Sequence, residues 1–219
     1  MFRIYTNILF LWKQLRRRNN EKSTYHINLT YLYNHWNRIM VLSTIRLGTS
    51  YICMKKFNTS VLDLTIYIID FLYRGRDFQR FWVLEVIARA PYFSFISVLH
   101  FRESLGLRGE DHIYLMKEHF YQALNETEHL EEMETRGGNE YWIDRFFAKH
   151  LVLLYYWIMV AYYFISPIDA YDINMKIEKH AYETYVKYSA YHPEDTKIAE
   201  IAEDELKHAR ELQLAMSMV

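Results

Sequence analysis

The sequence predicts an all-α protein. Glycine and proline are scarce, with 6 Gly and 3 Pro in 219 residues, and this scarcity excludes turn-rich β-sandwiches and glycine-rich phosphate loops. The few breaks separate long segments in which apolar and polar side chains show little alternation. Because strands rarely exceed about 10 residues, segments of this length indicate helices.

Six helices are expected in order along the chain. They cover residues 61–73, 77–105, 112–135, 140–165, 172–190 and 195–216. Pro91 should kink the second helix or cap its second half. Asn139 and Asp172 are plausible N-caps, and Pro193-Glu194-Asp195 is typical of a helix start.

Charge divides the chain into two domains. Residues 1–56 contain ten basic side chains and one acidic side chain, Glu21, whereas residues 57–219 contain 16 basic and 26 acidic ones. In this basic extension an apolar patch at 8–12 is followed directly by clustered cations, a combination that suits binding to an anionic membrane surface. The alternative is that the extension is a solvated tail. Nucleic-acid binding is not expected, since the basic stretch is one short end of an acidic chain.

One segment has the character of a membrane-surface helix. Residues 151–165 carry no charge and are rich in Tyr, but they fall short of the roughly 20 residues that span a bilayer. Residues 81–101 are similarly apolar, yet Glu85, Arg89 and His100 disfavour a lipid-exposed span. We therefore expect attachment to one leaflet (monotopic), with a buried core helix as the alternative for 151–165.

Glu85 lies in an unusual place, because its neighbours on every face of the expected helix are apolar. An unpaired buried carboxylate costs several kcal/mol, so some other group must compensate it. Arg89, one turn further on, could form an ion pair, and a metal ion is the other candidate. The single cysteine, Cys53, excludes a thiolate metal site, so carboxylates and histidines would have to hold any metal.

Two Glu-x-x-His motifs favour the metal. Glu126 with His129, and Glu205 with His208, each project from nearly one face of a helix. With Glu85 and one further carboxylate from 172–190, they complete the ligand set of a ferritin-like four-helix bundle with a di-iron carboxylate core. Glu178 and Glu183 are the candidates for that position. An oxygen-rich site with only two imidazoles suits iron or manganese.

Several motifs in order resemble the plastid terminal oxidases, the plastoquinol-oxidising branch of the alternative oxidase family. They are Arg76-Asp77-Phe78, Leu84-Glu85, Pro91-Tyr92-Phe93-Ser94-Phe95, Asn125-Glu126, Gly137-Gly138-Asn139 and His180-Ala181-Tyr182-Glu183-Thr184-Tyr185. The resemblance covers about residues 61–190 and returns more weakly at Asp204-Glu205 and His208.

The resemblance implies a quinol oxidase that reduces dioxygen to water at two non-haem iron ions without pumping protons. Its implied partners are plastoquinol or another quinol, dioxygen, a membrane lipid surface and a second copy in a homodimer. The implied location is the thylakoid or cytoplasmic membrane.

The resemblance also implies roles for individual residues. The implied metal ligands are Glu85, Glu126, His129, Glu178, Glu205 and His208, which selects Glu178 over Glu183. Asn125 and Asp204 would orient them, and Tyr185 would donate an electron or hydrogen atom. Arg80, Leu84, Ala181 and Thr184 would line the quinol pocket, with Arg80 bonded to a quinone oxygen. Apart from the family, Arg80 would be expected to pair with Asp77.

The chain departs from the family between Glu178 and Glu205, where a longer stretch is absent. A hairpin near His192-Pro193 would still place Glu178 and Glu205 side by side. At 1.5 Å per residue, each lies about 15–20 Å along its helix from the turn. Leu206 and Lys207 also differ from the family pattern. Two alternatives stay open: a ferritin-like iron-binding or ferroxidase protein, and a catalytically inactive, membrane-attached helical relative.

Overall fold

The computed structural model describes residues 53–219. The basic extension predicted over 1–56 therefore lies outside the described residues, except for its last four positions. Within 53–219 the chain forms helices and no strand, which confirms the all-α prediction. The helices are 53–72, α3 (Asp77–Ser104), α4 (Glu110–Thr135), α5 (Trp142–Ile165), α6 (Pro167–Ser189) and α7 (Thr196–Ala215).

Three details of the helix ends and breaks differ from the prediction. α6 begins at Pro167, where proline suits the first helical position, so Asp172 is inside the helix and is not its N-cap. Tyr141, rather than Asn139, precedes α5. α3 also continues through Pro91, so Pro91 does not cap a separate second half of the helix; the kink expected there stays a prediction.

The start of α7 is as predicted. Asp195 is its N-cap, and the Asp195 carboxylate accepts a hydrogen bond of 3.4 Å from the Ile198 N–H. This bond satisfies one of the backbone donors that a helix leaves free at its N-terminus.

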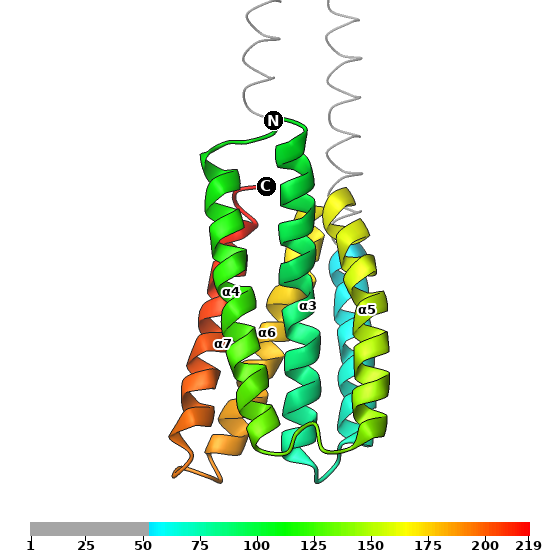
Figure 1. Ribbon diagram of the computed structural model, residues 1–219, viewed down its shortest axis with the longest axis vertical. Helices are drawn as coiled ribbons and strands as arrows, with labels where there is room; N and C mark the ends of the chain where they lie inside the picture. The colour runs from blue at the N-terminus through cyan, green and yellow to red at the C-terminus, as the bar shows by residue number, and fades with distance from the viewer. Residues whose placement is uncertain (1–52) are drawn as a thin grey trace, which may run out of the picture. The chain divides into compact units, whose positions relative to one another are not determined.

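The core of the bundle is formed by α3, α4, α6 and α7 (Figure 1). α3 packs against α4, α6 packs against α7, and contacts of α3 with α6 and of α4 with α7 join the two pairs. α5 packs against α3 and α6. The connections are short, and a single residue, Ser166, separates α5 from α6. Four helices in mutual contact confirm the predicted bundle.

Gly138 allows the loop after α4 to lie directly on α3. A Cβ atom at this position would lie 2.6 Å from the Phe78 carbonyl oxygen and 2.7 Å from Trp82 Cβ. Neither atom can move away without shifting α3, so only glycine permits this contact.

The helix over 53–72 is fastened to the bundle through buried Asn58. Its side-chain amide donates to the Asp169 carbonyl at 2.9 Å and to the Asp172 carboxylate at 3.0 Å. The Tyr162 hydroxyl donates to the Asn58 amide oxygen at 2.8 Å. The Asp172 carboxylate, which lies inside α6 and not at its start, thus binds a residue of another helix.

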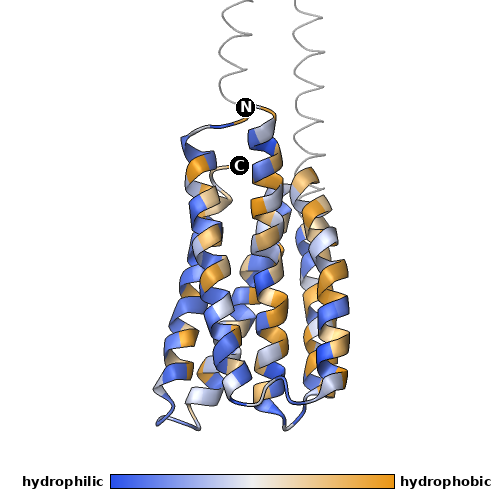
Figure 2. Ribbon diagram, in the orientation of Figure 1, coloured by the Kyte–Doolittle hydropathy of each residue, from blue (hydrophilic) through white to orange (hydrophobic). Residues whose placement is uncertain are grey.

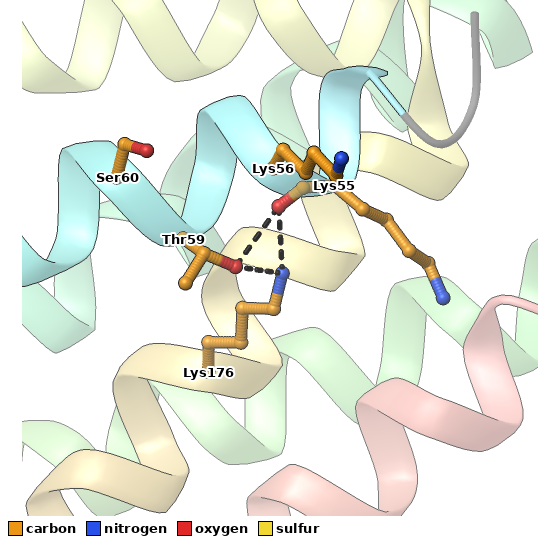
Figure 3. Close-up of a pocket in the computed structure, with 5 residues that line it drawn as sticks. All are labelled: Lys55, Lys56, Thr59, Ser60 and Lys176. Atoms are coloured by element: carbon orange, nitrogen blue, oxygen red, sulfur yellow. Dashed lines mark hydrogen bonds between the residues drawn. The ribbon is translucent and has the colours of Figure 1, made fainter. Parts of the chain in front are cut away.

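Lys176 makes a second attachment, at the edge of a surface hollow (Figure 3). Its ammonium donates to the Lys55 carbonyl at 3.2 Å, to the Thr59 hydroxyl at 3.1 Å and to Asp172 at 2.7 Å. Asn58 and Lys176 thus converge on one carboxylate and join the helix over 53–72 to α6.

Within residues 53–219, two helices, α3 and α5, are long and apolar enough to cross a membrane by length and composition. In α3 the apolar window is 72% buried, whereas in α5 it is only 11% buried. α3 is thus a core helix of the bundle, whereas the apolar side chains of α5 are mostly exposed; Figure 2 shows hydrophobic residues along α5.

Candidate metal centre

Each of the four core helices places one carboxylate at the same level inside the bundle. Glu85 comes from α3, Glu126 from α4, Glu178 from α6 and Glu205 from α7, and all four are buried. His129 and His208, one turn after Glu126 and Glu205, are buried with them. The structure thus brings together all six residues that the resemblance implied as ligands.

These residues form two overlapping groups. Within each group the candidate donor atoms all lie within 4.8 Å of one another. The groups are Glu85, Glu126, His129 and Glu205, and Glu126, Glu178, Glu205 and His208. Because both groups contain Glu126 and Glu205, the arrangement suits two neighbouring cations joined by two bridging carboxylates.

Hydrogen bonds hold the imidazoles against the carboxylates. His208 Nδ1 lies 2.8 Å from Glu126 Oε1, and His129 Nδ1 lies 3.1 Å from Glu205 Oε1. The other nitrogen of His129 lies 3.3 Å from the Asp204 carboxylate. That carboxylate accepts a bond of 3.4 Å from the Asn125 amide, so Asp204 fixes the orientation of the His129 ring.

Several donor atoms of the cluster have no hydrogen-bond partner within 53–219. They are the Oε2 atoms of Glu85, Glu126, Glu178 and Glu205, and His208 Nε2. Buried polar atoms are normally satisfied, and leaving them unpaired is costly. Four buried carboxylate oxygens without a partner, in side chains whose donor atoms lie within 4.8 Å of one another in each group, are typical of a dinuclear metal site, so the residues fit such a group.

Without a metal ion to balance the negative charge of its carboxylates, the cluster retains protons. Burial, followed by the charges of neighbouring carboxylates, raises the pKa of Glu85 and of Glu178 well above the ordinary value. Burial lowers the pKa of His129, but its bonds to Asp204 and Glu205 outweigh this and raise the pKa to about 10. A metal ion must displace these protons in order to bind.

Two alternatives from the sequence are excluded by these positions. Arg89 does not pair with Glu85; its guanidinium lies 3.5 Å from the Thr127 hydroxyl and over the Phe93 ring. Glu183 is exposed, whereas Glu178 is fully buried.

Comparison with known proteins agrees with this geometry. Residues 48–209 match the sequence model of a family described as alternative oxidase. The chain belongs to the alternative oxidase family. It is also 46% identical over 141 residues to "Ubiquinol oxidase 4, chloroplastic/chromoplastic" of Arabidopsis thaliana. These matches confirm the resemblance to the plastid branch of the alternative oxidases.

The match to the Arabidopsis protein covers 64% of this chain and 39% of the relative. This alternative oxidase chain therefore spans about two-fifths of the length of the curated relative. No solved structure matches the chain.

Two tyrosines bond to carboxylates at opposite ends of the alternative oxidase cluster. The Tyr185 hydroxyl donates to Glu85 Oε1, and the Tyr92 hydroxyl donates to Glu178 Oε1 at 2.8 Å. Tyr185 is a residue that the sequence predicts for the site, whereas Tyr92 is not. A signal was present, because Tyr92 follows Glu85 by seven residues, just as Tyr185 follows Glu178, and a spacing of almost two turns places both on one face.

The implied quinol-pocket residues lie on α3 and α6. Leu84 and Ala181 belong to one buried apolar cluster, and the Thr184 hydroxyl lies 3.4 Å from His180 Nε2. Arg80 pairs with Asp70 of the helix over 53–72, at 2.7 Å. The expected partner Asp77 was therefore wrong, because a residue brought in by tertiary structure takes its place.

Proposed function

We propose that this alternative oxidase chain is a quinol:oxygen oxidoreductase that passes electrons from plastoquinol to dioxygen and forms water. The observation that carries the proposal is the pair of overlapping donor groups, which share Glu126 and Glu205. The name of the Arabidopsis relative, a ubiquinol oxidase of chloroplasts and chromoplasts, supports a quinol as the electron donor.

Two non-haem irons are the proposed cofactor. Glu126 and Glu205 would bridge them; Glu85 and His129 would complete one site, and Glu178 and His208 the other. The oxygen-rich donor set with two imidazoles suits iron more than zinc or copper. When bound, the irons supply the redox couple that carries electrons from quinol to dioxygen.

Side chains around the cluster orient a candidate ligand, His129, and supply a proton from Tyr185. Asn125 holds Asp204, which in turn holds the His129 ring through Nε2. Tyr185 keeps a transferable proton on its hydroxyl oxygen, directly against Glu85. We propose that Tyr185 gives up this proton together with an electron during the reduction of dioxygen.

The quinol would bind beside Arg80, Leu84, Ala181 and Thr184. Arg80 would donate a hydrogen bond to a quinone oxygen, and the apolar Leu84 and Ala181 would contact the ring. Because Arg80 is paired with Asp70, a quinol that binds there has to compete with that carboxylate.

Access to a lipid-soluble quinol fits attachment to a single leaflet of the thylakoid or another membrane. α5 is the proposed attachment helix, because its apolar side chains are exposed along its length. Aromatic side chains such as Trp142 and Trp157 are exposed on it, and such rings favour the membrane interface. Assembly into a homodimer remains a prediction from the family resemblance.

The decisive experiment measures oxygen uptake by the detergent-solubilised full chain after loading with ferrous iron. Decyl-plastoquinol should drive the uptake, and Glu126→Ala should abolish it while circular dichroism stays helical. Glu183→Gln, which alters an exposed carboxylate, is the matched control and should retain activity.

Other outcomes would overturn the proposal. Uptake that is absent, or unaffected by Glu126→Ala, excludes the oxidase. Oxygen consumption driven by ferrous iron alone, with no response to quinol, would identify a ferroxidase. A chain that binds no iron would be an inactive relative.

A further inference from the structure

A second group of buried polar side chains lies beyond Tyr92, away from the carboxylates. His119 Nδ1 lies 2.8 Å from the Gln122 amide oxygen, and His119 Nε2 lies 2.8 Å from the Tyr171 hydroxyl. The Tyr171 hydroxyl lies 2.6 Å from that of Tyr163. All four side chains are buried, and they come from α4, α5 and α6.

The partners set the direction of each hydrogen bond. An amide oxygen only accepts, so His119 Nδ1 carries the hydrogen. Burial lowers the pKa of His119 to about 4, which leaves the ring neutral near pH 7 with one N–H. His119 Nε2 is therefore the acceptor for the Tyr171 hydroxyl, and the Tyr171 oxygen accepts from Tyr163.

Aromatic contacts connect this group to the metal centre. The Tyr92 ring lies 5.9 Å from the His208 ring on one side and 6.0 Å from the His119 ring on the other, between centroids. The His119 ring lies 5.5 Å from that of Tyr171. A series of short steps between aromatic rings thus leads from a candidate ligand to Tyr171.

We infer that Tyr171 is a reversible one-electron redox site, with His119 as the acceptor of its proton. On oxidation the Tyr171 O–H bond breaks and an N–H bond forms at His119 Nε2. The electron leaves to a one-electron oxidant, and a neutral tyrosyl radical and an imidazolium remain. The oxidant, which rests on the proposed function, is the dinuclear metal centre after its reaction with dioxygen.

The surroundings of Tyr171 suit this chemistry. A buried phenol without a base would have to become a radical cation, which an apolar core strongly disfavours. The imidazole removes that cost because the proton moves only along an existing hydrogen bond. A buried imidazolium is itself unfavourable, so the proton returns once a reductant resupplies the electron.

Such a site would hold an oxidising equivalent when no quinol is bound. Tyr185 is hydrogen bonded to Glu85, so its proton passes to a candidate ligand. Tyr171 passes its proton to a histidine outside the ligand set. The two tyrosines would therefore give separate radicals on opposite sides of the centre.

The test uses the full chain loaded with ferrous iron, mixed with dioxygen without quinol, freeze-quenched and examined by electron paramagnetic resonance. In a Tyr185→Phe background a tyrosyl radical should remain, and growth with ring-deuterated tyrosine should narrow its signal. Adding Tyr171→Phe should reduce the signal to background. Tyr155→Phe is the matched control, because the Tyr155 hydroxyl is buried and has no partner within 53–219; this change should leave the signal intact.

His119→Gln separates redox chemistry from a structural role and replaces Tyr171→Phe if that variant fails to fold. A glutamine oxygen can accept the Tyr171 hydrogen bond but cannot take its proton, so the radical should be lost although the fold is kept. A radical that survives both variants, in samples that load iron and consume dioxygen, overturns this inference and leaves the proposed oxidase standing. Failure to take up iron or dioxygen overturns both.

Discussion

Glu178 and Glu183 lie five positions apart in α6 and occupy opposite environments. Glu178 is fully buried among the other carboxylates, and its Oε2 atom has no partner within 53–219, whereas Glu183 is exposed. We expect Glu178→Gln to lose at least one of the two irons, since a neutral amide neither carries the charge nor matches the donor strength of a carboxylate.

Metal analysis after desalting measures this loss, with Glu183→Gln as the control that keeps full occupancy. Equal iron content in the two variants would show that Glu178 is not a ligand.

Arg80 offers a second prediction at the scale of single residues. Its ion pair with Asp70 is partly exposed, and such pairs contribute about 0.2–1 kcal/mol. Asp70→Asn should therefore free Arg80 for the quinol and lower KM by up to about fivefold, with kcat unchanged. Arg80→Gln should raise KM. An unaltered KM in both variants would place the quinol elsewhere.

At this scale the sequence predicted the six clustered side chains but only part of their surroundings. The Glu-x-x-His spacing and the apolar neighbours of Glu85 are signals between residues that are close in the sequence, so they can be recognised without the structure. His119 and Tyr171 carry no such signal among 20 tyrosines and 10 histidines. Their roles depend on hydroxyl and imidazole partners from other helices, as does the pairing of Arg80 with Asp70.

Among the helices, the end of α4 and the start of α7 are joined through Asp195. Its carboxylate caps α7 and also accepts from both Nη atoms of Arg136, with Nη2 at 3.0 Å. Asp195→Ala should destabilise the fold by about 1–2 kcal/mol through loss of the cap. Asp195→Asn keeps a capping oxygen and should cost less, roughly 0.2–1 kcal/mol, because the Arg136–Asp195 pair is only partly buried.

The difference between wild type and Asp195→Asn should depend on pH. The Arg136 hydrogen bonds hold the pKa of Asp195 below its ordinary value of 3.8. Because the folded pKa is lower than the unfolded one, the stabilisation is complete above 3.8 and disappears as pH falls through the folded value. Urea unfolding at neutral and acidic pH measures this, and a difference that does not change with pH would contradict the assignment.

Helix positions were largely predictable because Gly and Pro are so rare in this chain. The start of α7 at Asp195 depends on local capping and was predicted. Asp172 fits the same local rule but lies inside α6, because the helix already begins at Pro167; its carboxylate instead binds Asn58 and Lys176. Asp195 caps α7 while Arg136 also binds its carboxylate, so a tertiary partner does not by itself prevent capping.

For the molecule as a whole, the exposed apolar face of α5 is the feature that bears on location. Leu154 on α5 is 60% exposed and Leu124 on α4 is 65% exposed. A substitution at Leu124 is therefore a matched control for the same substitution at Leu154. Leu154→Glu should weaken binding to phosphatidylcholine–phosphatidylglycerol vesicles by at least about tenfold, because placing a charge in hydrocarbon costs roughly 2.5 kcal/mol or more.

Vesicle flotation measures this binding, and Leu124→Glu should float like the wild type. If the two variants float equally well, α5 is not the attachment helix. The sequence predicted that residues 151–165 are apolar. It could not show whether they form a helix at the membrane interface or a helix of the protein core. The distinction depends on which helices cover it.

The partnerless donor atoms at the centre of the bundle also tie the amount of folded protein to the supply of iron. Without metal, the four core helices must close over carboxylate oxygens that no protein group in 53–219 satisfies. A ligand that binds only the folded state stabilises it by mass action, in proportion to the logarithm of its concentration. Chains made during iron shortage should therefore open more often and be degraded sooner, so that iron scarcity lowers the abundance of this protein as well as its activity.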